Sequence, residues 1–114
     1  MKIFQTLLGA VLRLWRWAFY RQTLYRACHV EEAPDTLEKW TVYIVGADGY
    51  DWSAVMACPG GCGKALEMNL LPTATPVWAV REDNTGIVSL DPSVWLKTGC
   101  KCHFFLKNGV IDWV

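Results

Sequence analysis

The sequence predicts an α+β fold in which an N-terminal amphipathic helix precedes a small, mostly antiparallel β domain. Two changes of pattern carry this prediction. Apolar residues recur with helical spacing over residues 2 to 22, whereas from Thr41 onward short runs of β-branched and aromatic residues alternate with Gly, Asp, Asn and Pro. Asn108-Gly109 separates the last two runs and is a strong signal for a tight β-hairpin.

The N-terminal helix is predicted from one apolar stripe. Its members follow the i, i+3, i+4, i+7 spacing of a single helical face: Phe4, Leu7, Leu8, Val11, Leu12, Trp15 and Phe19. Arg13 and Arg16 lie beside Trp15, Trp17 and Phe19, a combination that suits peripheral contact with a membrane interface. The alternative is a helix that packs on the domain or on a partner. The run is too short and too charged to span a bilayer.

The chain divides into an N-terminal helical region at 1–28, a polar connector at 29–40 and a β-rich domain at 41–114. Strands are expected at 41–45, 52–57, 65–71, 77–81, 86–90, 103–107 and 110–114. Pro92 to Trp95 is expected to add one helical turn capped by Asp91.

Composition narrows the class of protein. Apolar residues make up 53% of the chain, which excludes a disordered segment. Residues 1–30 hold five cations and no acid, so the remaining six cations and eleven acids give residues 31–114 a net charge of −5. An acidic body disfavours nucleic acid as a partner. Five cysteines are an odd number, which favours a reducing cytoplasm over a disulfide framework.

Cysteines gather in two turns that are 37 residues apart. Cys58 and Cys62 lie in a Gly- and Pro-rich turn, and Cys100, Cys102 and His103 lie in a second one. Zinc takes thiolate and imidazole ligands in a tetrahedron, and chains often supply them as two close pairs from two turns. The sequence therefore predicts a zinc site made by the first pair, Cys100 and either Cys102 or His103.

The chain resembles a family of small zinc-binding peptidases from bacterial ubiquitination-like (Bub) operons. The stretches that carry the resemblance are Tyr43-Ile44-Val45-Gly46, Gly49-Tyr50, Cys58-Pro59, Gly61-Cys62-Gly63, Asn69-Leu70-Leu71-Pro72, Ser89-Leu90-Asp91-Pro92-Ser93-Val94-Trp95, Gly99-Cys100, His103-Phe104-Phe105-Leu106 and Ile111-Asp112-Trp113. The resemblance implies zinc as cofactor and a ubiquitin-like protein, with relatives of ubiquitin-activating or conjugating enzymes, as partners.

This chain departs from the pattern of those relatives in both turns. Relatives commonly carry a cysteine where this chain has Gly60, and a serine where it has Cys102. A ligand has therefore moved between the turns, or neither position is a ligand. The second version keeps every matching residue, and it makes Cys58, Cys62, Cys100 and His103 the expected ligands.

The third departure concerns a catalytic base. Many relatives carry a Glu near position 47, where this chain has Ala47 followed by Asp48. If that Glu activates water, this chain is inactive or uses Asp48. The expected function is a zinc-dependent peptidase that processes or removes a ubiquitin-like protein. The alternative is a non-catalytic adaptor with structural zinc, docking through tryptophans such as Trp78, Trp95 and Trp113; four filled ligand positions would make the metal structural and place any catalysis elsewhere.

Overall fold

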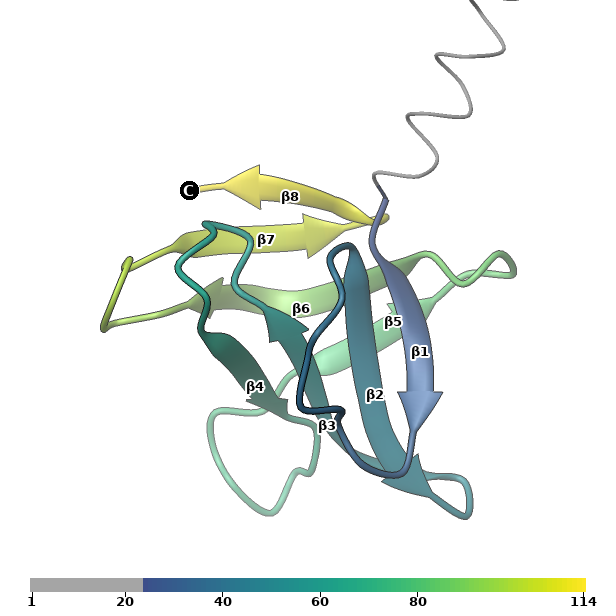
Figure 1. Ribbon diagram of the computed structural model, residues 1–114. Helices are drawn as coiled ribbons and strands as arrows, with labels where there is room; N and C mark the ends of the chain where they lie inside the picture. Colours follow the sequence, from purple (N-terminus) through teal and green to yellow (C-terminus); the bar gives the residue numbers. More distant parts are fainter. Residues whose placement is uncertain (1–23) are drawn as a thin grey trace, which may run out of the picture.

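The computed structural model describes residues 24–114, which form two four-stranded β-sheets (Figure 1). Sheet A has the strand order β1-β2-β3-β4 and sheet B the order β5-β6-β7-β8. The strands span Arg26–Val30 (β1), Thr41–Ala47 (β2), Tyr50–Ala57 (β3), Ala65–Asn69 (β4), Ala79–Glu82 (β5), Val88–Trp95 (β6), His103–Lys107 (β7) and Val110–Trp113 (β8).

The predicted α+β class is wrong for this part of the chain, because residues 24–114 contain strands and no helix. The amphipathic helix expected at 2–22, with its membrane contact, lies outside the described residues. The helical turn expected at Pro92 to Trp95 is part of β6 instead. Pairing with β7 outweighs the local Asp-Pro signal, and a register shift between Leu90 and Val94 accommodates the proline.

Strand β1 is the one described strand that the sequence analysis did not predict. Arg26–Val30 pairs in parallel with β2, with Arg26 opposite Thr41 and Val30 opposite Val45. None of its five residues is fully buried. A strand that buries neither face does not require the alternation of apolar and polar residues by which a half-buried strand is predicted. The segment expected to be a connector, 29–40, therefore begins with the last two residues of this strand.

Two tight hairpins follow the chemistry of their turn residues. Asp48 and Gly49 join β2 to β3 with φ of 53° and 80°, and Asn108 and Gly109 join β7 to β8 with φ of 49° and 77°. Asp, Asn and Gly are the residues that adopt positive φ most readily. The predicted Asn-Gly hairpin is confirmed.

The main hydrophobic core lies between the two sheets. Its largest fully buried side chains are Phe104, Ile44, Met56, Met68, Leu106, Val42 and Val88. A smaller cluster, formed by Tyr43, Val45 and Val55, lies on the outer face of sheet A under the 31–40 segment. None of the described residues belongs to a helix with the length and hydropathy needed to cross a membrane.

Candidate active site and cysteine cluster

The pairing of β6 with β7 brings Ser93 and His103 to one face of sheet B. Trp95 lies opposite His103, and Leu96 N–H donates to the Cys102 carbonyl at 2.8 Å. Hydrogen-bonded and non-hydrogen-bonded pairs alternate along an antiparallel ladder, so Trp95 and His103 form a non-hydrogen-bonded pair, whose side chains are the closer kind. Ser93 precedes Trp95 by two residues and shares its face. Val94 and Phe104, between them, point into the core.

The Ser93 hydroxyl lies within hydrogen-bond distance of the His103 imidazole, with Oγ 2.9 Å from Nε2. In the tautomer with hydrogen on Nδ1, Nε2 accepts the hydroxyl proton, as a general base does. The Trp95 ring stacks on the imidazole with centroids 5.0 Å apart and 14° between the planes. Trp78 Nε1 donates to the Ser93 carbonyl at 3.2 Å, which fixes the backbone beside the hydroxyl.

Ser93 is the accessible serine of this chain. The sequence contains three serines, and the other two, Ser53 and Ser89, are buried. The Ser89 hydroxyl is also engaged, because it accepts the backbone N–H of Asn108 at 2.8 Å. Ser93 is half-buried and has the imidazole as its hydroxyl partner. A serine nucleophile in this chain is therefore Ser93.

The second feature of the site is a cluster of four cysteines, Cys58, Cys62, Cys100 and Cys102, called here the cysteine cluster. The turn between β3 and β4 supplies the first two, and the connection between β6 and β7 supplies the others. The Cys58 sulfur is 3.2 Å from that of Cys100 and 3.3 Å from that of Cys102. The sulfurs of Cys58, Cys62 and Cys100 all lie within 4.8 Å of one another. All four are free thiols.

Backbone N–H groups support three of these sulfurs in the same local pattern. The N–H of Gly60 hydrogen-bonds the Cys58 sulfur, that of Lys64 the Cys62 sulfur, and that of Cys102 the Cys100 sulfur. Each donor lies two residues after its acceptor. Such donors orient thiolate ligands and offset their charge at metal sites.

Proton affinity differs among the four thiols. Burial raises the pKa of Cys58 and of Cys102. The hydrogen bond between Cys62 and Cys100 raises the pKa of Cys100. The same hydrogen bond lowers the pKa of Cys62 to about 7, and the backbone N–H of Lys64 adds to this effect. Deprotonation of the group is therefore easiest at Cys62.

The cysteine cluster has the composition and the spacing of a metal site. Four thiolates at about 2.3 Å from a tetrahedral ion lie about 3.8 Å apart, and the measured separations from Cys58 to Cys100 and Cys102 are slightly shorter. Gly60 borders the sulfurs directly, because a Cβ there would lie in ordinary van der Waals contact, 3.5 Å from the sulfurs of Cys58 and Cys100. The four cysteines could hold one metal ion.

Comparison with known proteins agrees with the serine and histidine geometry. Residues 29–114 match the family described as "Bacterial ubiquitination-like system serine protease (BubE)". This chain belongs to the BubE family. No curated protein and no solved structure matches the chain. The family description names a serine protease, and Ser93 is the serine whose hydroxyl contacts a histidine in this chain.

The BubE fold brings together three of the four ligands expected from the sequence. Cys58, Cys62 and Cys100 meet, and Cys102 joins them, while His103 is hydrogen-bonded to Ser93 instead. Adjacent strand residues point to opposite faces, so Cys102 turns inward to the cluster and His103 outward to Ser93. The same alternation excludes a Cys102 nucleophile paired with His103.

Asp48 and Ala47 lie far from the cysteine cluster. Ala47 is the last residue of β2 and Asp48 begins the turn that precedes β3, whereas Cys58 directly follows the other end of that strand. At about 3.3 Å per residue, β3 separates them by roughly 20 Å. Asp48 therefore cannot pass a proton to or from a water held at the cluster.

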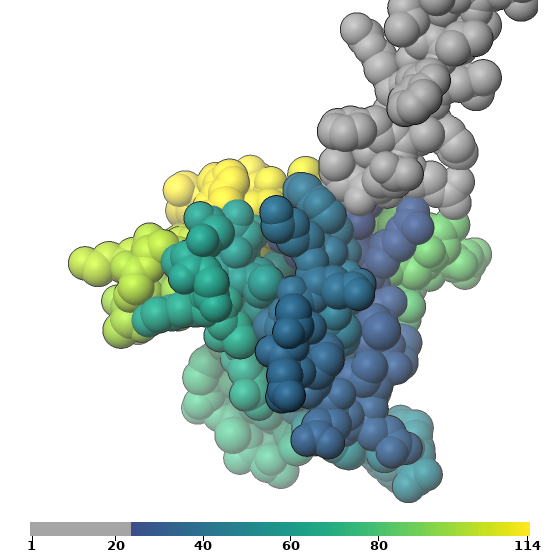
Figure 2. All heavy atoms as spheres, viewed as in Figure 1, coloured from purple at the N-terminus to yellow at the C-terminus, as the bar shows by residue number. Residues whose placement is uncertain are grey.

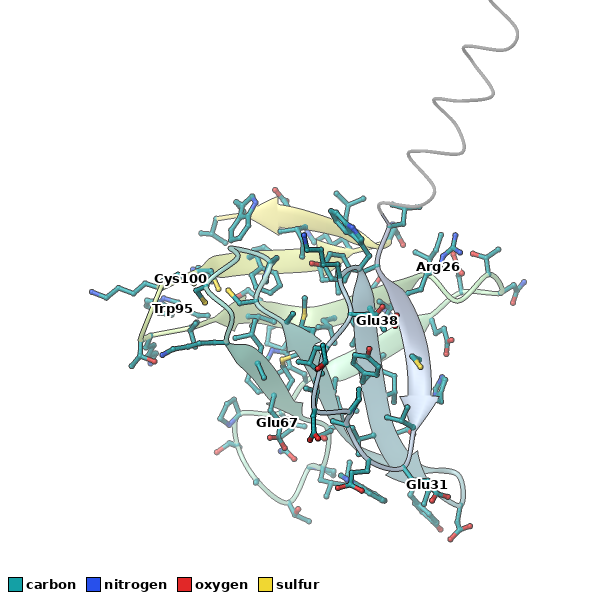
Figure 3. All side chains as sticks on the ribbon, viewed as in Figure 1. Arg26, Glu31, Glu38, Glu67, Trp95 and Cys100 are labelled. Carbon is teal, nitrogen blue, oxygen red and sulfur yellow. The ribbon has the colours of Figure 1, made fainter. Side chains whose placement is uncertain are left out.

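The Ser–His pair and the cysteine cluster occupy the same end of the molecule. Figure 3 shows Trp95 and Cys100 close together there, and Figure 2 shows the β3–β4 turn beside the β6–β7 connection. Sequence reasoning missed Ser93, because it assigned His103 to the metal. The signal that points to Ser93 is its position two residues before Trp95, on a strand that pairs with the one carrying His103.

Proposed function

We propose that this BubE-family chain is a serine peptidase in which Ser93 is the nucleophile and His103 the general base. The observation that carries the proposal is the 2.9 Å separation of Ser93 Oγ and His103 Nε2. Nucleophile and base within hydrogen-bond reach are the minimum constellation for acyl transfer. Among the residues that the structure describes, no carboxylate hydrogen-bonds the His103 ring, and Trp95 orients it by stacking.

The reaction follows from these two groups. As Ser93 Oγ bonds to the substrate carbonyl carbon, its proton passes to His103 Nε2. The bond to the leaving group then breaks, and the imidazolium returns the proton to the departing amine or hydroxyl. A water molecule, deprotonated by the same imidazole, hydrolyses the resulting ester, so that the acid is released and Ser93 regains its hydrogen.

The cysteine cluster is proposed to hold structural zinc. Cys58, Cys62, Cys100 and Cys102 supply four thiolates, the closed set that is typical of structural zinc rather than of a catalytic site with an open position. Zinc bound there would supply a cross-link between the two cysteine turns. Cys102 immediately precedes His103 and Cys62 lies three residues before β4, so these thiolates would fix the position of the base relative to sheet A.

The substrate class is proposed to be a ubiquitin-like protein, or a conjugate of one, because the family belongs to a bacterial ubiquitination-like system. Ser93 is half-buried, so its substrate has to be a flexible segment that can approach the face of sheet B, such as the C-terminal tail of a ubiquitin-like protein. Cleavage at the tail releases either a short extension or the conjugated partner.

The test is cleavage of a ubiquitin-like protein of the same system that carries a C-terminal peptide extension. Ser93→Ala and His103→Gln are each expected to lower kcat at least about 1,000-fold. The matched control is His29→Gln, because His29 is the other histidine of the chain and its ring contacts Glu82. Wild-type cleavage by the Ser93→Ala variant would refute the proposal. Binding of the substrate without cleavage by the wild-type chain would favour the non-catalytic adaptor.

A further inference from the structure

Strand β4 has a free edge with unpaired main-chain groups. It is the last strand of sheet A, and its ladder with β3 includes the bonds Cys58 N–H to Lys64 O and Leu70 N–H to Trp52 O. Because bonding alternates along such a ladder, Ala65, Glu67 and Asn69 turn their N–H and C=O groups away from β3. Asn69 O accepts Trp78 N–H. Within the described residues no bond to the outward groups of Ala65 and Glu67 is formed.

The backbone of Trp95 also has free main-chain groups, and Trp95 lines the same pocket as Ala65 and Glu67. Trp95 belongs to a non-hydrogen-bonded pair with His103, so its N–H and C=O point away from β7. On that side β5 pairs with β6 only as far as Asp91. Within the described residues, no strand therefore pairs with the far side of the Trp95 backbone, two residues beyond Ser93.

A small pocket that is open to solvent, with both apolar and polar lining atoms, lies between these two edges. It has a volume of about 140 Å³. Its apolar wall is formed by Leu66, Met68, Trp78, Val94, Trp95 and Leu96, and Ala65 and Glu67 of β4 complete the lining. An apolar cavity of about 150 Å³ is large enough for one benzene molecule, whereas whole-ligand pockets measure about 300–1,000 Å³. The space therefore fits a single apolar side chain. The cavity adjoins the Ser–His pair because Trp95 lines it and also stacks on His103.

We propose that an extended peptide segment of the substrate pairs with the free edge of β4 and inserts one apolar side chain into this cavity. The inference rests on the proposed peptidase function and specifies how its substrate is held. Edge pairing supplies main-chain hydrogen bonds with Ala65 and Glu67, and the cavity supplies selectivity. The segment that carries the scissile bond is then aligned with Ser93, which lies one residue before Val94 in the cavity wall.

The features of the edge favour a peptide over a second copy of the chain. Strand β4 has only five residues, and Glu67 is at its centre. Antiparallel pairing of two copies centred there places Glu67 opposite Glu67, and like charges directly opposite each other are destabilising. A substrate peptide with an uncharged residue at this position meets no such penalty.

The experiment removes one edge donor without disturbing the fold. Glu67→Pro deletes an outward N–H that no ladder bond uses, and proline is tolerated on the outward positions of edge strands. Glu67→Ala is the matched control, because it removes the side chain and keeps the N–H. The probes are a fluorogenic tetrapeptide–coumarin library and diisopropyl fluorophosphate, which is too small to use the edge.

Glu67→Pro is expected to lower kcat/KM for the best library peptide at least about tenfold relative to Glu67→Ala, while diisopropyl fluorophosphate labels the two variants at rates that agree within about twofold. A wild-type kcat/KM for Glu67→Pro overturns the edge proposal. If Glu67→Pro unfolds, wild-type enzyme is assayed with peptides N-methylated at each amide in turn, and equal rates for all of them overturn it. Failure of fluorophosphate to label wild-type Ser93 refutes the peptidase function itself.

Discussion

The Trp95 indole stacks on the His103 imidazole with 5.0 Å between ring centroids and 14° between ring planes. The contact exists because the two residues are a directly opposed, non-hydrogen-bonded pair of β6 and β7. Trp95 is 59% exposed, so the stacking orients the imidazole at the surface of sheet B and adds little to the core. Lys97 Nζ lies over the Trp95 ring, 5.2 Å from its centroid.

Loss of this ring contact is expected to slow the chemistry of Ser93. Aromatic pairs contribute about 0.5–1.5 kcal/mol beyond area burial, which corresponds to about 2- to 12-fold in rate. Trp95→Ala is expected to slow fluorophosphate labelling of Ser93 by that factor, and Trp95→Phe is expected to restore most of it. Thermal unfolding of both variants should match wild type within a few degrees. An unchanged labelling rate for Trp95→Ala would show that stacking does not position the base.

Metal replacement separates a structural ion from a catalytic one. Protein purified without chelator is expected to contain one zinc per chain, bound by four sulfurs in X-ray absorption. Cobalt in place of zinc is expected to leave kcat within about twofold, because the reaction uses Ser93 and His103 while the ion only joins the two turns. A large change of kcat with the identity of the metal would contradict the structural role.

The fourth ligand is tested by comparing two cysteines. Cys102→Ser is expected to weaken metal affinity at least about tenfold and to lower the melting temperature, because it removes a thiolate from the cysteine cluster. Cys28→Ser is the control, since Cys28 is exposed on β1, away from the cluster. Metal titration and thermal unfolding measure both effects. Equal metal affinity in the two variants would exclude Cys102 as a ligand.

Asp48 is expected to have no part in the reaction. Asp48→Asn should leave kcat and zinc content unchanged, because the hairpin turn and the cysteine cluster are at opposite ends of β3. Asparagine also tolerates the positive φ of 53° at this position, so the fold is kept. Steady-state kinetics and metal analysis provide the check. A loss of more than tenfold in kcat would show that Asp48 takes part in the reaction.

Phe104 is expected to dominate the stability of sheet B. Its side chain is 0% exposed and packs between the sheets behind the Ser–His pair. Phe104→Ala is expected to lower the free energy of unfolding by about 3–5 kcal/mol, measured by urea denaturation. The neighbouring Phe105 points to the outer face, where Lys107 covers its ring, so Phe105→Ala should cost clearly less. Equal costs would contradict the assigned strand register.

Most strands of the β domain could be predicted from the sequence, because alternation, turn residues and the Asn108-Gly109 hairpin are local signals. Strand β1 could not, because its parallel pairing with β2 leaves no alternating burial pattern in three half-buried and two exposed residues. The local Asp-Pro signal at β6 was misleading, since cross-strand pairing decided the structure there.

The sequence predicted that Cys58, Cys62 and Cys100 come together, and the structure places them in one cluster; it did not predict the different positions of Cys102 and His103. Spacing alone allows either residue to complete the metal site. The register of β7 places the two side chains differently, because it turns Cys102 toward the core and His103 toward Ser93. Ser93 carries no motif of its own, and it becomes a candidate only when β6 places it against an imidazole.

The most direct test of the account is the site of covalent modification by diisopropyl fluorophosphate, located by peptide mass spectrometry. The account predicts one adduct per chain on Ser93, and an adduct formed at least about 100-fold more slowly in His103→Gln than in wild type or His29→Gln. An unmodified Ser93 in folded, metal-loaded protein, or labelling that does not depend on His103, would contradict it.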